Sequence, residues 1–118
     1  WARSRWPRAQ ISLAGFSFGG AVAIRAAVAT HPARLITVAP AVDRVHVALD
    51  RLPTCPWLVV QGDADDVVDP NTVRAWVEQL PNPPEFLLLP GIGHFFHGRL
   101  NELKDVVMSW LRQGAVTE

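Results

Sequence analysis

Residues 10–29 read QISLAGFSFGGAVAIRAAVA, and this stretch decides the fold. Its opening segment, Gln10–Ala14, is mostly apolar and predicts a short buried strand. The glycine-rich segment Gly15–Gly20 predicts a tight turn. Ala21–Ala29 is dense in alanine, the best helix former, and predicts a helix that ends before His31 and Pro32. A strand, a tight turn and a helix in this order predict the first unit of a parallel sheet.

The rest of the chain repeats this alternation. Three more short apolar runs predict strands: Leu35–Val38, Trp57–Val60 and Phe86–Leu89. Apolar residues at helical spacing predict three further helical segments: a short connector (Val42, Val45, Leu49, Leu52), a helix opened by Asp69 and Pro70 (Val73, Trp76, Val77, Leu80) and a final helix (Leu100, Leu103, Val107, Trp110, Leu111). Continuous apolar strands separated by helices predict an α/β protein. We expect a three-layer αβα arrangement around a mostly parallel sheet of about four strands.

Size and composition narrow the possible classes. A chain of 118 residues predicts one domain over 1–118, and 49% hydrophobic residues exclude intrinsic disorder. Eleven basic residues balance eleven acidic ones. This balance argues against binding to nucleic acid or to an anionic membrane surface, because both need a basic excess, and we expect neither nucleic acid nor a membrane as a partner. A single cysteine, Cys55, cannot form an internal disulfide, so we expect a cytoplasmic protein.

The first residues suggest a truncated domain. Two tryptophans, Trp1 and Trp6, stand before Pro7 without a signal-peptide pattern. We interpret this segment as the last turn of a helix whose beginning is missing, and the alternative is a frayed tail. We therefore expect a domain truncated at its N-terminus.

The predicted turn carries the strongest chemical signal. Gly15-Phe16-Ser17-Phe18-Gly19 is a G-x-S-x-G motif between a predicted strand and a predicted helix, the context of a nucleophile elbow. Such a turn strains the serine backbone and brings the residues two before and two after it close together. We therefore expect Gly15 and Gly19 to avoid a collision there. The following helix would aim its first N–H groups at the same space, so Ser17 is a candidate nucleophile. The alternative is a glycine–serine turn without chemistry.

An acidic loop follows the third predicted strand. Four aspartates lie in it: Asp63, Asp65, Asp66 and Asp69. Clustered carboxylates can bind Ca²⁺, but the spacing lacks the glycine and glutamate of an EF-hand, and we expect no metal or cofactor. A solvated loop that caps the next helix explains Asp63 and Asp69. One of the aspartates is instead a candidate to orient a histidine.

That histidine is expected in the loop after the fourth predicted strand, which reads Gly93-His94-Phe95-Phe96-His97. His94 follows a glycine and has room to reach across the edge of the sheet. His97 lies nearer the last helix and is interpreted as a capping or surface residue. Sites of parallel sheets form at the carboxyl ends of the strands. The chain order serine, aspartate, histidine is that of the α/β hydrolases.

With these motifs the sequence resembles the C-terminal half of an α/β hydrolase. It most resembles the small lidless bacterial hydrolases that carry GFSFGG, a G-[DE]-x-D-x-V-V-x-P loop and a GHFFHGRL loop, from about Gln10 to Leu111. The resemblance implies that Ser17 is the nucleophile, Asp65 the acid of the triad and His94 the base. Asp66 would then face solvent or cap the next helix.

The resemblance implies acyl transfer through an acyl-enzyme, with a small ester as substrate. The backbone N–H of Phe18 would be one oxyanion donor, and the second would come from a part of the fold outside this sequence. The open site, without room for a large lid in residues 41–56, favours small soluble esters. A thioesterase or a small peptidase would use the same triad, and a non-catalytic interaction module would lack half of the oxyanion hole.

Two further expectations follow from the resemblance. The strand that bears Ser17 would become an exposed apolar edge, which predicts self-association. Four aromatic residues near the motifs are candidates to line an acyl pocket, with simple packing as the alternative: Phe16, Phe18, Phe95 and Phe96.

Overall fold

A four-stranded parallel sheet forms the centre of the computed structural model, which describes residues 12–42 and 52–117. The strands lie in the order β1-β2-β3-β4 and span Ser12–Phe16, Arg34–Val38, Trp57–Gly62 and Glu85–Leu89. The helices α2, α3 and α4 span Phe18–Thr30, Pro70–Glu78 and Leu100–Thr117. Because all pairs of neighbouring strands are parallel, their carboxyl ends share one edge of the sheet.

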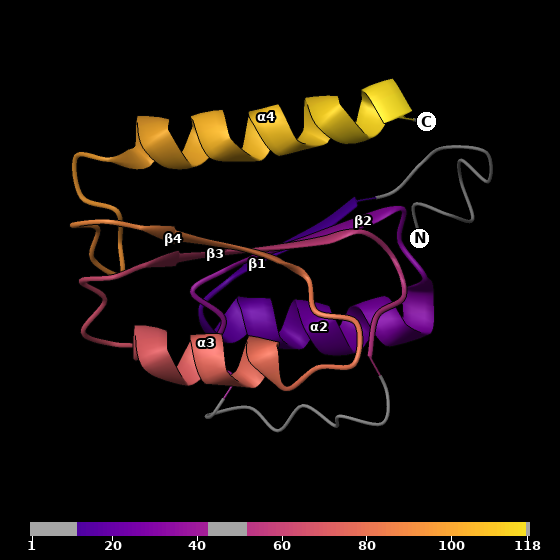
Figure 1. Ribbon diagram of the computed structural model, residues 1–118, viewed down its shortest axis with the longest axis horizontal. Helices are drawn as coiled ribbons and strands as arrows, with labels where there is room; N and C mark the ends of the chain where they lie inside the picture. The colour runs from indigo at the N-terminus through magenta and orange to yellow at the C-terminus, as the bar shows by residue number, and fades with distance from the viewer. Residues whose placement is uncertain (1–11, 43–51, 118) are drawn as a thin grey trace.

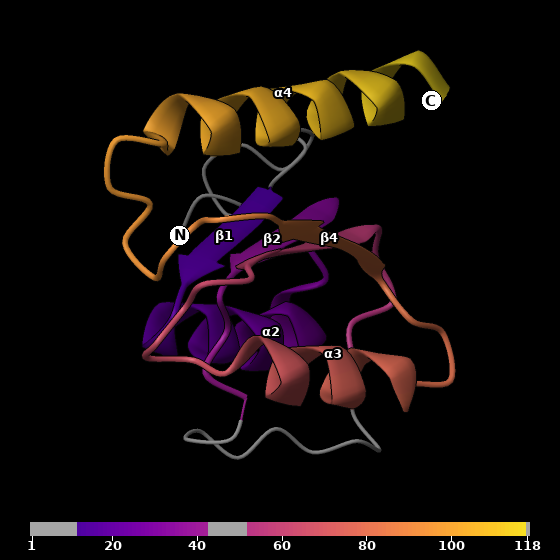
Figure 2. The same ribbon diagram turned by 60° about the vertical axis from the view of Figure 1, so that its left-hand side comes forward.

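The elements form three layers. Helices α2 and α3 lie on one face of the sheet and α4 lies on the other, as Figures 1 and 2 show. The predicted α/β class and the parallel sheet are therefore confirmed. The expected connector helix falls largely on residues 43–51, and the expected helix end on residues 1–6; both lie outside the described residues.

The predicted turn is tighter than expected. β1 runs to Phe16 and α2 begins at Phe18, so that Ser17 alone stands between them. At Gly20 the start of α2 passes close to the loop that follows β2. An added Cβ at this position would be 3.2 Å from the Cα of Pro40. The small residues at the start of the helix thus allow it to pack directly against the end of β2.

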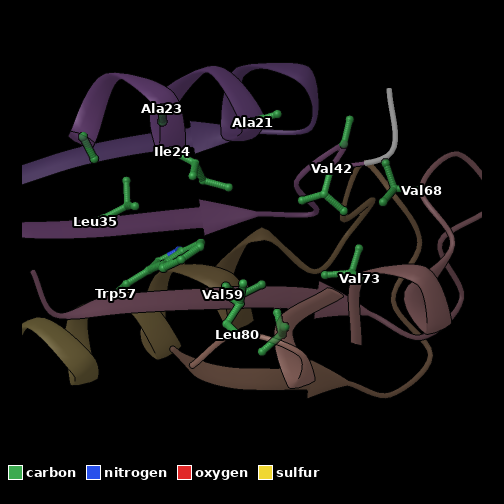
Figure 3. Close-up of a cluster of buried hydrophobic side chains, with 13 residues drawn as sticks. Ala21, Ala23, Ile24, Leu35, Val42, Trp57, Val59, Val68, Val73 and Leu80 are labelled. Carbon is green, nitrogen blue, oxygen red and sulfur yellow. The ribbon is translucent and has the colours of Figure 1, made fainter. Parts of the chain in front are cut away.

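Two apolar clusters hold the layers together. The cluster on the α2 and α3 face includes Ile24, Leu35, Trp57 and Val73 (Figure 3). The inner face predicted for the helix opened by Asp69 and Pro70, which is α3, is confirmed there. Val73, Val77 and Leu80 are buried, and Trp76 packs against them. Burial of these side chains supplies the main stabilisation of the sheet.

The cluster on the other face lies under α4. Phe96 and residues of β2 and β3 are buried in it, and five α4 residues pack against them: Leu103, Val106, Val107, Trp110 and Leu111. Leu100 was predicted on the same apolar face, and this is wrong because its side chain is 64% exposed. Leu100 is the first residue of α4, at the carboxyl edge of the sheet. The residues of α4 that pack against the core begin at Leu103.

The four strands differ in burial. Every residue of β2 and β3 is buried, whereas β1 alternates between exposed and half-buried residues. In the described part of the chain β1 pairs only with β2, so it lies at an edge of the sheet, as expected. Ser17 therefore follows an edge strand, while the acidic loop follows the fully buried β3.

Candidate active site

Three of the four strands carry the candidate residues just beyond their carboxyl ends. Ser17 directly follows β1, Asp65 lies three residues after β3, and His94 lies five residues after β4. The three loops belong to the same edge of the parallel sheet, which is where sites form in such folds. The geometry of each loop determines what its side chain can do.

Ser17 occupies a strained backbone conformation, with φ 55° and ψ −119°. L-residues rarely adopt a positive φ, and such strain persists only where the surroundings enforce it. The N–H of Ser17 donates to the carbonyl oxygen of Val38 at 2.8 Å. Its own carbonyl accepts from the N–H groups of Gly20 at 3.0 Å and Ala41 at 3.0 Å. Helix α2 and the loop after β2 therefore hold the turn from two sides.

The Ser17 side chain is not used to cap the helix. Serine is a preferred residue at this position because its hydroxyl usually accepts a bond from the first turn. Here Ser17 precedes α2 without such a bond. Phe18 is the first helical residue, and the N–H groups of a first turn lack acceptors within the helix. The Ser17 hydroxyl therefore accepts no hydrogen bond from the first turn of α2. The elbow presents both the hydroxyl and the first N–H groups of the helix.

The two glycines of the motif have different roles. An added Cβ at Gly15 would lie 2.3 Å from the carbonyl oxygen of Gly19, so only glycine fits there. At Gly19 an added Cβ would meet none of the described atoms within 4 Å. The expectation of a collision is therefore correct for Gly15 and wrong for Gly19. The close contact is made by the Gly19 backbone, and its own Cβ position points into open space.

The Asp65 carboxylate is buried and accepts four hydrogen bonds. Its Oδ1 accepts from the N–H groups of Val67 at 2.9 Å and Val68 at 2.8 Å. Its Oδ2 accepts from Gln61 Nε2 at 3.1 Å and pairs with His94 Nδ1 at 2.8 Å. Burial alone would raise the pKa of Asp65, but these donors outweigh it and hold that pKa below its ordinary value. Asp65 is therefore an anion at neutral pH.

His94 is fixed by this carboxylate and by two aromatic rings. The imidazole is 4% exposed, and an anionic partner at Nδ1 requires the proton on that nitrogen. The ring of Phe16 lies 4.9 Å away, and the ring of Phe95 meets it edge-on at 4.9 Å. Nε2 is then the nitrogen that can accept a proton. Because Phe16 directly precedes Ser17, the histidine loop is in contact with the elbow.

The other aspartates of the loop have separate positions. Asp69 caps α3 as expected, its Oδ1 accepting from Asn71 N–H at 2.9 Å. Asp66 is exposed, in agreement with the resemblance. Asp63 is exposed, as expected of a solvated residue, but its carboxylate caps no helix and instead accepts from the N–H of Gly91 at 2.7 Å. Asp63 therefore ties the acidic loop to the histidine loop.

A second contact brings the same two loops together. An added Cβ at Gly62 would lie 2.1 Å from the carbonyl oxygen of Ile92, and the N–H of Ala64 donates to that oxygen at 3.0 Å. The backbone of β3 thus touches the loop after β4 two residues before His94. This contact fixes the distance between the loops that carry Asp65 and His94.

The aromatic residues divide between packing and an open cavity. Phe96 is buried in the core, whereas Phe16, Phe18 and Phe95 are exposed. An apolar cavity of about 500 Å³ is lined by Phe16, Phe95 and Phe96 together with residues of β1, β2 and α4, and Phe18 does not line it. Of the two histidines in the loop, His97 is exposed, as expected of a surface residue.

Sequence reasoning missed Gln61. It is completely buried near the end of β3 and donates to the Asp65 carboxylate. The available signal was a polar residue that directly follows the apolar run of a buried strand, immediately before the acidic loop.

Neither a metal-binding cluster nor a membrane-spanning helix is found among the described residues. No group of three or more histidine, cysteine, aspartate or glutamate side chains in them is placed to hold a metal ion. None of the helices in the described ranges is long and apolar enough to cross a membrane.

The architecture and the arrangement of the strand ends are those of the α/β hydrolases. A solved α/β serine hydrolase without a lid from Xanthomonas campestris is 42% identical in sequence, with a TM-score of 0.90 over 96% of this chain and 51% of its own. A serine hydrolase homologue from Coxiella burnetii is also 42% identical, with a TM-score of 0.88 over 94% of this chain and 53% of its own. The chain therefore has the α/β-hydrolase fold and is similar over almost its whole length to these two serine hydrolases.

Two curated relatives of similar sequence are both described as uncharacterized proteins. An uncharacterized protein of Rickettsia prowazekii is 28% identical over 94% of this chain and 51% of its own length. One of Mycobacterium tuberculosis is 29% identical over 92% and 47%. The chain spans about half the length of these relatives. No known protein-family profile matches the sequence.

Proposed function

We propose that this chain carries the catalytic triad of a serine hydrolase that cleaves small, soluble carboxylic esters. Ser17 is the nucleophile, His94 the general base and Asp65 the residue that orients the imidazole. The observation that carries the proposal is the buried pair of His94 and Asp65, 2.8 Å apart, in contact with the residue that precedes Ser17. An anion fixed on Nδ1 leaves Nε2 to accept a proton, which is what a serine nucleophile requires.

The reaction proceeds in two halves. His94 Nε2 takes the proton of the Ser17 hydroxyl as its oxygen attacks the ester carbonyl, and Asp65 stabilises the imidazolium that forms. The imidazolium then protonates the departing alcohol, which leaves an acyl group on Ser17. In the second half His94 takes a proton from water, the hydroxide oxygen attacks the acyl carbonyl, and the proton returns to Ser17 as the acid departs.

The negative oxygen of each tetrahedral intermediate needs N–H donors. We propose the N–H of Phe18, at the start of α2, as one of them; the positive end of the helix supports this proposal because it favours the same charge. Removing one donor from an oxyanion hole lowers turnover by about 100- to 1000-fold. A second donor is therefore required for full activity of the whole protein.

Two observations favour small esters over long-chain lipids. Phe16 and Phe18 flank Ser17 and Phe95 lies beside Phe16, and all three rings are exposed in the described part of the chain. The similar Xanthomonas campestris protein is described as a serine hydrolase without a lid. An uncovered site suits substrates that reach it from water.

Turnover of a matched series tests the proposal. We expect acetyl and butyryl p-nitrophenyl esters to be hydrolysed faster than the palmitoyl ester, and the activity to disappear in Ser17→Ala. Thioesters and anilides with the same acyl groups distinguish the thioesterase and peptidase alternatives. If the whole protein, with its second oxyanion donor, cleaves none of the three series, the proposed hydrolase activity is wrong and the non-catalytic alternative is favoured.

A further inference from the structure

A buried amide touches the candidate catalytic carboxylate from the side of the sheet. Gln61 lies in β3 with none of its surface exposed. Its Nε2 donates to Asp65 Oδ2 at 3.1 Å and to the carbonyl oxygen of Gly62 at 3.0 Å. Its Oε1 is buried and has no hydrogen-bond partner among the residues that the structure describes. The side chain is therefore satisfied at one end only.

Chemistry fixes the orientation of this amide. Both groups in contact with Nε2 are acceptors, one a carboxylate anion and the other a backbone carbonyl. Rotating the amide by 180° would place its oxygen against both of them, with no donor between. The nitrogen must therefore face Asp65, and the oxygen is the end of the amide without a hydrogen-bond partner among the described residues.

The unpartnered oxygen indicates that stability does not explain the residue. A buried amide oxygen without a donor destabilises the folded state relative to an apolar side chain of the same size. The neighbouring positions in β3, Val59 and Val60, are both apolar and fully buried. The advantage of glutamine at position 61 must therefore come from its Nε2 donor.

We propose that Gln61 is a positioning residue for the triad: its amide holds the Asp65 carboxylate so that Oδ2 faces His94 Nδ1. The inference rests on the function proposed above for Ser17, His94 and Asp65. The N–H groups of Val67 and Val68 hold Oδ1 from the loop side. Gln61 is the only other described donor besides His94, and it holds Oδ2 from the strand side. Without it, the histidine alone would define where Oδ2 lies.

The test replaces the amide by a side chain of similar length that has no donor. Gln61→Met removes the contact to Asp65 and also the unpartnered oxygen. The matched control is Thr37→Val, because Thr37 is equally buried in β2 and its hydroxyl accepts a bond from Trp57 Nε1 at 3.0 Å, away from the triad. Two quantities are compared: kcat at unchanged KM, per site titrated with a fluorophosphonate, and the proton NMR signal of His94 Nδ1–H in the free protein.

We expect Gln61→Met to lower kcat by about tenfold to a hundredfold with KM unchanged, because a displaced catalytic group slows the chemical step without touching the substrate. The Nδ1 proton signal should shift and broaden through faster exchange with water. Thr37→Val should lower the thermal midpoint and change neither quantity. A folded Gln61→Met protein with wild-type kcat and an unchanged Nδ1 signal would overturn the inference.

A second measurement does not depend on the folding of that variant. In the wild-type protein one side-chain amide proton of Gln61 should exchange slowly, and its signal should move in Asp65→Asn. An amide that exchanges at the rate of a solvent-exposed glutamine and ignores Asp65→Asn would contradict the inference. Because neither NMR signal requires turnover, a protein that hydrolyses no ester would refute the proposed function and leave this test of Gln61 intact.

Discussion

Asp65 and His94 are held by their side chains in a buried corner, whereas Ser17 is held by its backbone at the end of an edge strand. Four hydrogen bonds reach the Asp65 carboxylate, and the contact between Asp63 and Gly91 ties its loop to the histidine loop. Ser17 is positioned by bonds of its N–H and carbonyl groups and by a close approach at Gly15. The acid–base pair therefore depends on particular side chains, and the elbow depends on backbone conformation. Substitutions should affect the two regions in different ways.

The largest effect should come from the imidazole. His94→Ala removes the proposed base, and we expect kcat for a short ester to fall by up to about a millionfold, as for other triads. Its matched control is His97→Ala, three residues further on and exposed, which should leave kcat nearly unchanged. Steady-state kinetics of both variants decide between the histidines, and the reverse pattern would mean that His97 is the base.

The second-largest effect on kcat should come from the Asp65 carboxylate. Asp65→Asn keeps the shape of the side chain but no longer requires the proton on His94 Nδ1, so we expect kcat to fall by about 10,000-fold. The control, Asp66→Asn, alters an exposed neighbour and should have little effect. Equal losses in the two variants, measured with the same ester, would remove the support for Asp65 as the acid.

In the elbow, substitutions of the two glycines should change the free energy of unfolding by different amounts. Gly15→Ala places a Cβ 2.3 Å from the Gly19 carbonyl oxygen, so the turn must shift and we expect a loss of about 1–3 kcal/mol in the free energy of unfolding. Gly19→Ala meets open space in the first turn of α2 and should be neutral or stabilising by up to about 1 kcal/mol. Urea unfolding measures both. Equal destabilisation by the two substitutions would show that the elbow is not constrained as described.

The smallest effect concerns acid stability. Folding lowers the pKa of Asp65 below its ordinary value of 3.8, so its contribution to stability is complete above that value and is lost as the pH falls through the lower, folded value. Urea unfolding between pH 6 and about pH 3 should show a steeper decline for the wild-type protein than for Asp65→Asn. Parallel declines would indicate that Asp65 has the same pKa in the folded and unfolded states.

The sequence predicted the layers and the strand order along the chain because apolar runs and helical spacing are local signals. The G-x-S-x-G motif likewise located the elbow, whose strain and close approach at Gly15 are properties of five consecutive residues. The sequence could not predict that the Asp63 carboxylate accepts a hydrogen bond from Gly91 or that Gln61 donates one to Asp65. Both contacts depend on how β3 and β4 lie beside each other and on the side to which a loop turns. Leu100 was misplaced for a similar reason, since a helix periodicity does not reveal where along its length the helix meets the sheet.

Reactivity of Ser17 toward a fluorophosphonate tests the central claim most directly, because labelling needs an activated hydroxyl and no particular substrate. Mass spectrometry of the digested protein should find the phosphonyl group on the peptide that contains Ser17, with labelling abolished in Ser17→Ala and strongly slowed in His94→Ala. Labelling that occurs elsewhere, or that proceeds at the same rate without His94, would contradict the account.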